Sequence, residues 1–279
     1  MKKVKSDWHI HTEHSCDSAC ITMEDLVNEQ KQNGITDFGV TDHLHSLRQE
    51  GDILNSKKAF DEILEKYTNL KGHFHFGVEA SVMSKWDLDN IKAGINIHRR
   101  ECPKEGAIPT FAFNDEFLNK YGIEYVVAGV HWQLFRHTTK QELINEYFRQ
   151  YMYAATHKDV DILAHFLWWN HWEKDVDSNP FLDMSVITPS MRSELECALK
   201  ENNVAFEVNV GLICLEYGIA TESFADEYLS YCKELQDKGI ALSMATDLHD
   251  RHIIGKYDKA NELFDKYKID VDKFWKINK

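Results

Sequence analysis

The chain has 279 residues, of which 43% are hydrophobic and 28% are charged, and its formal net charge is −14. A chain of this length can bury a large core. The acidic balance argues against a broad binding surface for polymeric nucleic acid or for anionic membranes, because both require basic patches. It does not exclude a small anionic substrate, since bound divalent cations can reverse the local field.

Cysteine usage and the distribution of apolar residues suggest a cytoplasmic protein. The six cysteines form no Cys-x-x-Cys pair, and in a chain of this length they indicate reduced thiols. No apolar segment follows the basic residues of MKKVK at the start, and no run approaches the ~18 apolar residues of a membrane span. We therefore expect neither a signal peptide nor a membrane helix.

Strand-like and helix-like patterns alternate along the chain. The first helix is bounded by Thr22, with Asp25 three residues later as a variant capping box, and by Gly34. In chain order the sequence predicts a strand at 4–10, a helix at 23–33, a strand at 37–43, a helix around 60–67, strands at 74–80 and 125–131, a helix around 143–151, a strand at 160–165, a helix at 189–199, a strand at 204–210, a helix at 224–239, a strand at 240–249 and a helix at 257–267.

This alternation implies a parallel sheet with crossover helices. At this length a closed barrel is the simplest arrangement of seven such strands. We therefore predict an α/β fold, a seven-stranded TIM-like barrel, as a single domain over residues 1–279. The least regular stretch, residues 84–120, is expected to form an irregular excursion between the third and fourth strands.

Residues able to bind metals stand at the ends of almost all predicted strands. His9 and His11, two residues apart, point to the same face of the first strand. Each residue has an ordinary structural explanation when taken alone, but those explanations would have to hold independently at six strand ends. In a parallel barrel these ends meet at one rim, where active sites are found. The residues concerned are His9, His11, His43, Glu79, His131, His165, Asp247 and His249.

The residue types indicate both the metal and the chemistry. Histidine and carboxylate ligands without cysteine favour zinc, manganese or iron over calcium. The set exceeds the three or four protein ligands of one catalytic zinc, so two or three divalent ions are predicted, with Glu79 placed to bridge two of them. Clustered ions polarise a phosphoryl oxygen and generate hydroxide at neutral pH. The sequence thus favours a hydrolase.

The ordered set of motifs resembles the PHP (polymerase and histidinol phosphatase) superfamily. Its first motif appears as DWHIHTEHSCD, and VTDH, FGVEA, AGVHW, DILAH and TDLHD follow in order over essentially the whole chain. The resemblance adds Asp17 as a ninth metal ligand and implies a distorted seven-stranded barrel with a trinuclear centre. The implied ligand groups are His9, His11, Glu79 and Asp247 for one ion, Asp17, His43 and His249 for a second, and Glu79, His131 and His165 for the third.

The resemblance also implies phosphoester hydrolysis by a metal-bridging hydroxide, with Glu79 and Asp247 holding the ions that it bridges. Within the superfamily the chain looks most like the stand-alone histidinol-phosphatase branch, so the expected substrate is a small phosphomonoester such as histidinol phosphate. In that branch, arginines near the metals bind the phosphate. Here Arg251 is the first candidate and Arg192 the second, followed by Arg136 and Arg48.

Several other residues have two interpretations each. His14 is either a neighbour of the ligands that transfers protons or an exposed loop residue. Asn209, at the end of the sixth strand, either contacts substrate or orients a water, or caps the following turn. The tryptophans at 132, 168, 169 and 172 either pack at the barrel mouth or form an aromatic wall for a ring-bearing substrate.

Three competing functions remain open at this level. An amidohydrolase also begins with His-x-His on a barrel strand, but it usually carries a lysine at the end of the fourth strand, where this chain has His131. A non-catalytic barrel would be indicated by lost ligands, and none is lost. A nucleotide or phosphotyrosine phosphatase, or a nuclease, would keep the chemistry and change the substrate, although the acidic charge disfavours polymeric nucleic acid.

Overall fold

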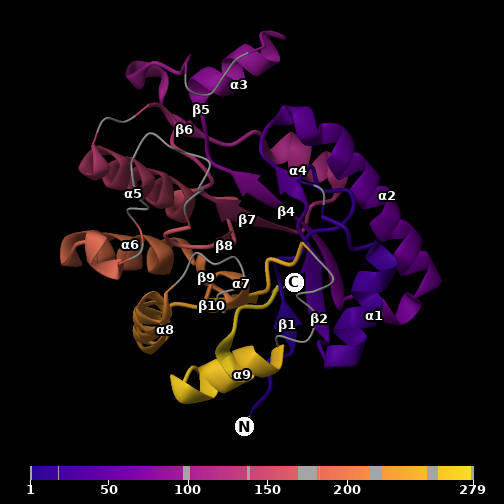
Figure 1. Cartoon of the computed structure of the whole chain (residues 1–279). Helices are drawn as coiled ribbons and strands as arrows, with labels where there is room; N and C mark the ends of the chain where they lie inside the picture. Colours follow the sequence, from indigo (N-terminus) through magenta and orange to yellow (C-terminus); the bar gives the residue numbers. More distant parts are fainter. Residues whose placement is uncertain are drawn as a thin grey trace.

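Seven parallel strands form the centre of the molecule, and helices surround them (Figure 1). The computed structural model describes residues 2–17, 19–96, 101–136, 139–168, 181, 183–213, 221–249 and 257–277. The strands pair in the order β1-β2-β4-β7-β8-β9-β10, and the short β3 also pairs with β4. Their bounds are β1 Ser6–Asp7, β2 Asp37–Val40, β3 His43–Leu44, β4 Phe74–Ser81, β7 Tyr125–Gly129, β8 Ile162–Leu163, β9 Ala205–Asn209 and β10 Leu242–Ala245.

Main-chain hydrogen bonds join the last strand to the first and bring the sheet close to a complete barrel. The Asp247 amide donates to the His9 carbonyl at 2.9 Å, and the His11 amide donates to the Leu248 carbonyl at 3.0 Å. A parallel bridge between Ile10 and Leu248 extends this contact. The predicted TIM-like fold is thereby confirmed. The hydrogen bonds between the last strand and the first involve candidate ligands.

Each predicted strand coincides with an observed one. The strand β4 runs one residue beyond its predicted end, and the other observed strands are shorter than predicted. The segment 37–43 divides into β2 and β3, with Thr41 and Asp42 between them. Main-chain hydrogen bonds continue there, since the Thr41 amide donates to the Ile10 carbonyl at 2.8 Å and the Glu79 amide donates to the Asp42 carbonyl at 3.3 Å. The Asp42 carboxylate also accepts hydrogen bonds from the amide and the hydroxyl of Thr12, at 2.6 and 2.8 Å.

Helices cover the outside of the strands. In Figure 1, α1 and α2 lie on one side of the barrel and α5, α6 and α8 on the other. The first helix has the predicted bounds, and the Thr22 hydroxyl accepts from the Asp25 amide at 3.0 Å. The helices are α1 Met23–Asn33, α2 Glu50–Lys66, α3 Lys85–Lys92, α4 Asp115–Tyr121, α5 Lys140–Thr156, α6 Pro189–Asn202, α7 Val210–Ile213, α8 Glu222–Asp237 and α9 Tyr257–Lys266.

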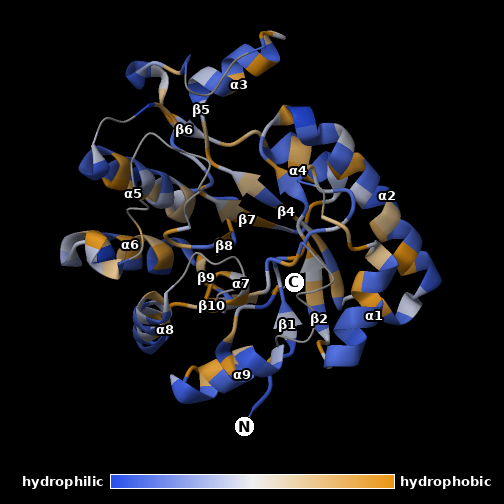
Figure 2. Cartoon of the chain, in the orientation of Figure 1, coloured by the Kyte–Doolittle hydropathy of each residue, from blue (hydrophilic) through white to orange (hydrophobic). Residues whose placement is uncertain are grey.

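The core of the described residues has three parts: one between strands and helices, one inside the barrel, and a small one around Trp132. The interior cluster consists of Trp8, Tyr125, Val127, Ile162, Ala164 and Ala205. The Tyr125 ring occupies the space that a side chain at Gly39 or Gly77 would take, and its hydroxyl donates to the Trp8 carbonyl at 2.9 Å. Figure 2 shows the outer helix α8 as mostly hydrophilic, whereas β4 and β7 are more hydrophobic. The apolar interior closes the amino end of the barrel and leaves the carboxyl end for polar groups.

The excursion after β4 is more regular than expected. Its described part contains α3, α4 and an antiparallel pair formed by β5 Met83–Ser84 and β6 Pro109–Thr110. The prediction of an irregular segment at 84–120 was therefore wrong for these residues. The helix α3 is capped by the Ser84 hydroxyl, which accepts from the Asp87 amide at 2.9 Å, and so local capping supplied order that no hydrophobic period had indicated.

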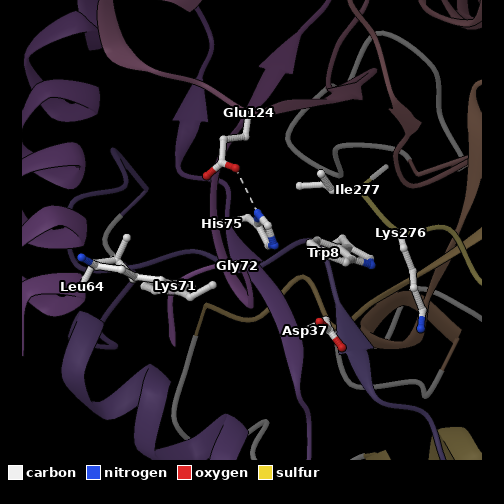
Figure 3. A pocket seen from close by; sticks show the side chains of 10 residues that line it. Trp8, Asp37, Leu64, Lys71, Gly72, His75, Glu124, Lys276 and Ile277 are labelled. Atoms are coloured by element: carbon white, nitrogen blue, oxygen red, sulfur yellow. Dashed lines mark hydrogen bonds and ion pairs between the residues drawn. The ribbon is translucent and has the colours of Figure 1, made fainter. Parts of the chain in front are cut away.

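A cavity of about 500 Å³ lies at the amino ends of the strands, opposite the candidate ligands. Figure 3 shows the His75 ring in this cavity, between Glu124 and Trp8. The His75 Nδ1 and Glu124 Oε2 atoms are 3.0 Å apart.

Among the described residues, the longest helices are too short and too polar to cross a membrane.

Candidate metal centre

The nine candidate ligands lie together at the carboxyl ends of the strands. Four of them, His9, His131, His165 and Asp247, stand two residues beyond the ends of β1, β7, β8 and β10. Glu79 lies within β4, and its side chain is fully buried. Parallel strands direct all of these residues to the same rim. The set is completed by His11, Asp17, His43 and His249.

The first group, His9, His11, Glu79 and Asp247, has the spacing of a tetrahedral site. The Nε2 atoms of the two histidines are 3.0 Å apart. Glu79 Oε2 lies 3.3 and 3.5 Å from them, and Asp247 Oδ1 lies 3.5 and 3.3 Å from them. Four ligands at ~2.0–2.1 Å from a zinc ion are themselves about 3.3–3.4 Å apart. The five distances above are close to this spacing, and His9, His11 and Asp247 form a group whose ligand atoms converge.

The third group uses the other oxygen of Glu79. Its Oε1 atom lies 2.9 Å from His131 Nε2 and 2.7 Å from His165 Nε2, and the two imidazole nitrogens are 3.2 Å apart. A side chain at Gly129 would intrude here, because a Cβ would lie 2.6 Å from Glu79 Oε1. One carboxylate thus faces two ligand groups, which is the arrangement of a bridging ligand.

The second group, Asp17, His43 and His249, lies on the open side of the site. Asp17 Oδ2 is 2.6 Å from His249 Nε2 and 3.2 Å from His43 Nε2. The side chains of Asp17 and His249 are 29% and 26% exposed, whereas those of the first group are almost fully buried. The Nδ1 atom of His43 is 2.6 Å from Glu79 Oε2, so His43 contacts two groups.

The charges of the site suit cation binding. Burial opposes ionisation of Glu79, but His131, His9 and His43 outweigh it and hold the pKa of this carboxyl well below its usual range. Burial lowers the pKa of His131 to about 4, which leaves its ring neutral. In His43 the attraction of Glu79 and Asp17 outweighs burial and raises the pKa to about 10. Cation binding at His43 must therefore release a proton.

Three buried atoms of the candidate ligands have no hydrogen-bond partner of suitable geometry among the described residues. They are Glu79 Oε2, His43 Nδ1 and His165 Nδ1, and the first two approach each other without the alignment of a hydrogen bond. Buried polar atoms normally have a partner. A divalent cation would supply one, and the imidazole and carboxylate donors match zinc, manganese or iron. These clusters of histidine and carboxylate groups indicate divalent metal binding.

Two of the ligands have an unusual backbone conformation. His165 has a φ of 23° and Asp247 a φ of 53°, in the left-handed region that few residues other than glycine adopt. Such conformations cost on the order of 1–3 kcal/mol each and gather at functional sites. At both residues the chain leaves its strand and turns the side chain toward the barrel axis.

The candidate phosphate-binding residues lie away from the ligand groups or outside the described residues. Arg192, at the start of α6, donates to the carbonyls of Met184 at 2.7 Å and Ile187 at 3.3 Å, and it lies over the Tyr231 ring. Arg48 is exposed in the turn before α2, and Arg136 is exposed beyond β7. Arg251 lies outside the described residues, so its role stays a prediction.

His14 and the tryptophans predicted near the site differ in burial and in their distance from the ligands. The His14 side chain is 25% exposed in the turn after β1, near Glu13, and belongs to none of the ligand groups. Trp132 is buried and packs with the excursion, while Trp168 is half-buried, with its ring centroid 5.6 Å from that of His131. Trp169 and Trp172 fall outside the described residues.

Sequence reasoning missed several residues that hold the ligands in place. Glu207, in the middle of β9, lies 2.8 Å from His9 Nδ1. Ser81 lies between His45 and His131, with its hydroxyl 2.7 and 2.8 Å from their Nδ1 atoms. A glutamate between Phe206 and Val208 in an apolar strand was the available signal for Glu207. Nothing in the sequence distinguishes Ser81 from other serines.

Comparison with known proteins supports this description. The family model of the PHP domain matches residues 7–210, which include seven of the nine candidate ligands. A histidinol phosphate phosphatase from Lactococcus lactis has a similar structure, with a TM-score of 0.58 and 18% identity over 94% of this chain and 93% of that one. At this identity the likeness shows the fold.

Other similarities are weaker. A Xaa-Pro dipeptidase matches with a TM-score of 0.41 and 12% identity, over 96% of this chain and 71% of that one. The ochratoxinase of A. niger matches with a TM-score of 0.40 and 12% identity, over 88% and 63%. A comparison with curated proteins gave no significant match. Because the family model spans well over half of the sequence, the chain belongs to the PHP domain family.

Proposed function

We propose that this protein hydrolyses a small phosphomonoester, such as histidinol phosphate, at a centre of two to three divalent metal ions. Membership of the PHP family identifies the chain as a metal-dependent phosphoesterase. The observation that carries the finer proposal is the division of Glu79 between two ligand groups, with one oxygen turned to each. A shared carboxylate of this kind would hold two ions, which together would stabilise the attacking and leaving oxygens of a phosphoester.

The side chains have distinct tasks in this proposal. The ions, when bound, supply Lewis-acid stabilisation of the phosphate charge and an activated water. Glu79 and Asp247 hold them from the buried side, and the low pKa of each carboxyl keeps it ionised. Asp17 and His249 complete the open side, from which substrate approaches. Trp168, half-buried beside His131, offers an apolar edge to the leaving group.

The choice of substrate rests on the fold and on the charge of the chain. The similar phosphatase of L. lactis was solved with zinc, L-histidinol and phosphate. The net charge of −14 disfavours long polyanions, whereas a single phosphate can be held by the ions themselves. A small phosphorylated metabolite is therefore the class of substrate that we propose.

Substitution of the buried carboxylates tests the mechanism. We expect Glu79→Ala and Asp247→Ala to lower the hydrolysis of a chromogenic phosphomonoester by more than ~100-fold in protein loaded with zinc, manganese or iron. The control is Asp61→Ala, which alters an exposed carboxylate on α2 that pairs with Lys57. Full activity in both site variants would contradict the mechanism, and fewer than two ions per loaded chain would contradict the multinuclear centre.

A panel of phosphomonoesters tests the substrate. Histidinol phosphate, nucleotides, sugar phosphates and phosphotyrosine are compared by kcat/KM with the same loaded protein. The proposal expects the highest value for a small phosphorylated metabolite. A nucleotide or phosphotyrosine at the top of the ranking would leave the phosphoesterase chemistry intact and replace the substrate class.

A further inference from the structure

Glu207 is a charged residue in the barrel interior that the proposed reaction does not use. It lies in β9 and is fully buried. Side chains alternate along a strand, so Glu207 shares the inward face with Ala205 and Asn209, while Phe206 and Val208 face the helices. Among the described residues it belongs to none of the groups whose ligand atoms converge. A buried carboxylate needs strong partners, because burial of an isolated charge is costly.

Its partners are the candidate ligands and a residue that touches one. Glu207 Oε2 lies 2.8 Å from His9 Nδ1, and both side chains are fully buried. Glu207 Oε1 accepts from the His165 amide at 3.2 Å and from Asn209 Nδ2 at 2.9 Å. Asn209 Nδ2 also donates to Asp247 Oδ2 at 3.0 Å. One carboxylate is thus tied to ligands carried by three different strands.

The contact with His9 determines which ring nitrogen carries the proton. A His9 ring that pairs with Glu207 Oε2 through Nδ1 carries its hydrogen there, because a carboxylate oxygen is a hydrogen-bond acceptor. In the neutral ring the Nε2 atom then keeps its lone pair. Nε2 is the atom that lies among His11, Glu79 and Asp247 in the first group. Glu207 therefore prepares His9 to bind a cation.

We propose that Glu207 is a positioning residue that couples the first and third ligand groups. It orients the His9 ring and, through Asn209, the Asp247 carboxylate of the first group. It also holds the main chain of His165, which belongs to the third group. This inference rests on the proposed function only in requiring that the groups bind metal ions.

Glutamine at this position cannot replace glutamate, although the two have the same shape. If its amino group faces His9, then Nδ1 has to accept, the proton moves to Nε2, and the lone pair directed at the ion is lost. If its oxygen faces His9, the amino group meets the backbone N–H of His165, and two buried donors oppose each other. Either orientation weakens cation binding.

The opposite end of the barrel provides a matched control. Glu124 lies beside a histidine ring and a main-chain amide, as Glu207 does, with 3.0 Å between Glu124 Oε2 and His75 Nδ1 and 3.2 Å between Glu124 Oε1 and the Phe76 nitrogen (Figure 3). These residues lie at the amino ends of the strands, away from the ligand groups. Glu124→Gln therefore removes a carboxylate with the same two kinds of partner, although one that is 22% exposed, without touching the metal centre.

The test measures zinc affinity, without substrate. Wild type, Glu207→Gln and Glu124→Gln are dialysed against buffered free zinc, and zinc per chain is determined by elemental analysis. We expect the apparent Kd of Glu207→Gln to rise by about 10–100-fold, and that of Glu124→Gln to stay at the wild-type value. Wild-type affinity in Glu207→Gln, or an equal loss in Glu124→Gln, overturns the proposal.

A second variant covers the case in which Glu207→Gln does not fold, as judged by circular dichroism in chelator. Asn209→Ala keeps the Glu207 carboxylate and removes its link to Asp247, together with the hydrogen bond that Asn209 Oδ1 accepts from the Leu212 amide at 2.8 Å. We expect a smaller loss of zinc affinity. If only this variant folds, a lower affinity supports the proposal and an unchanged one overturns it. A wild-type protein that binds zinc but hydrolyses no phosphomonoester contradicts the proposed function and leaves this result intact.

Discussion

Gly129, at the end of β7, is a residue whose missing side chain makes room for the metal centre. A Cβ there would lie 2.6 Å from Glu79 Oε1 and closer still to the His131 ring. Both groups sit in a packed site with little freedom to move, because neighbouring strands hold them. Glu79 and His131 therefore occupy the space that a side chain at residue 129 would need.

Substitution of this glycine tests the packing. We expect Gly129→Ala to displace Glu79 or His131 and to lower zinc affinity by more than about tenfold, measured by equilibrium dialysis. The matched control is Gly51→Ala in α2, where a Cβ meets nothing within 4 Å and alanine favours the helix by up to ~1 kcal/mol. Wild-type zinc affinity in Gly129→Ala would show that the site tolerates the added methyl group.

Individual ligands were predictable because each interrupts an apolar pattern. His131 follows YVVAGV and His165 follows DILA, so each polar residue comes directly after an apolar run. Glu207 interrupts its strand in the same way, yet it was missed because it stands before the strand end, where the chemistry was expected. Position along the strand was thus a useful but incomplete criterion.

The strands at the amino end of the barrel are held by polar contacts as well as by apolar packing. Asp161 precedes β8, and its carboxylate accepts from the Val126 amide of β7 at 2.9 Å. Its main-chain carbonyl accepts from the Ala205 amide of β9 at 2.8 Å. Burial raises the pKa of the Asp161 carboxyl to about 6. One residue therefore links three strands and carries a carboxyl that resists ionisation.

This raised pKa predicts a pH dependence of stability. Between pH 4 and 6 the folded state binds more protons at Asp161 than the unfolded state, so the stability contributed by the protonated carboxyl is lost as pH rises through 6. Asp161→Asn cannot ionise and keeps an acceptor for the Val126 amide. We expect the variant to gain up to about 3 kcal/mol over wild type between pH 4 and pH 7, measured by urea unfolding. A difference that does not vary with pH would contradict this account.

The ends of the elements were harder to predict than their existence. The first helix was predicted with the bounds that it has, because its caps are local contacts at Thr22 and Gly34. The first strand was predicted over 4–10, but the regular strand ends at Asp7, and beyond it pairing continues only as an isolated bridge at Ile10. Hydrophobic periodicity shows where an element lies, whereas its end depends on the neighbours that it meets.

At the scale of the whole molecule, the metal centre joins segments that are far apart in the chain. Its ligands come from β3, from β4, and from the residues after β1, β7, β8 and β10. The joint between β10 and β1 passes through His9 and Asp247, which are both candidate ligands. Bound ions would therefore stabilise the contact between β10 and β1 that closes the barrel.

Removal of the ions should lower the stability of the fold. An ion present at ~100 times its Kd stabilises the folded state by about 2.7 kcal/mol per site, provided that the unfolded chain does not bind it. We expect chelation to lower the Tm and added zinc to restore it, as followed by circular dichroism. Asp247→Asn should respond less to zinc, and asparagine tolerates the left-handed backbone at this residue. An unchanged Tm after chelation would show that the ions do not stabilise the fold.

The sequence alone determined the fold class, eight of the candidate ligands and the metal-dependent hydrolase chemistry, and the resemblance to the PHP family added the ninth ligand, Asp17. The sequence could do so because side chains alternate along strands and parallel strands end at one rim, so the ligands can be read from local patterns. The tertiary structure alone decided that Glu79 turns one oxygen to each of two groups, that His43 contacts two groups, and that Glu207 holds His9. These relations depend on strand register and on the closure of the barrel, which bring together residues separated by up to about two hundred positions.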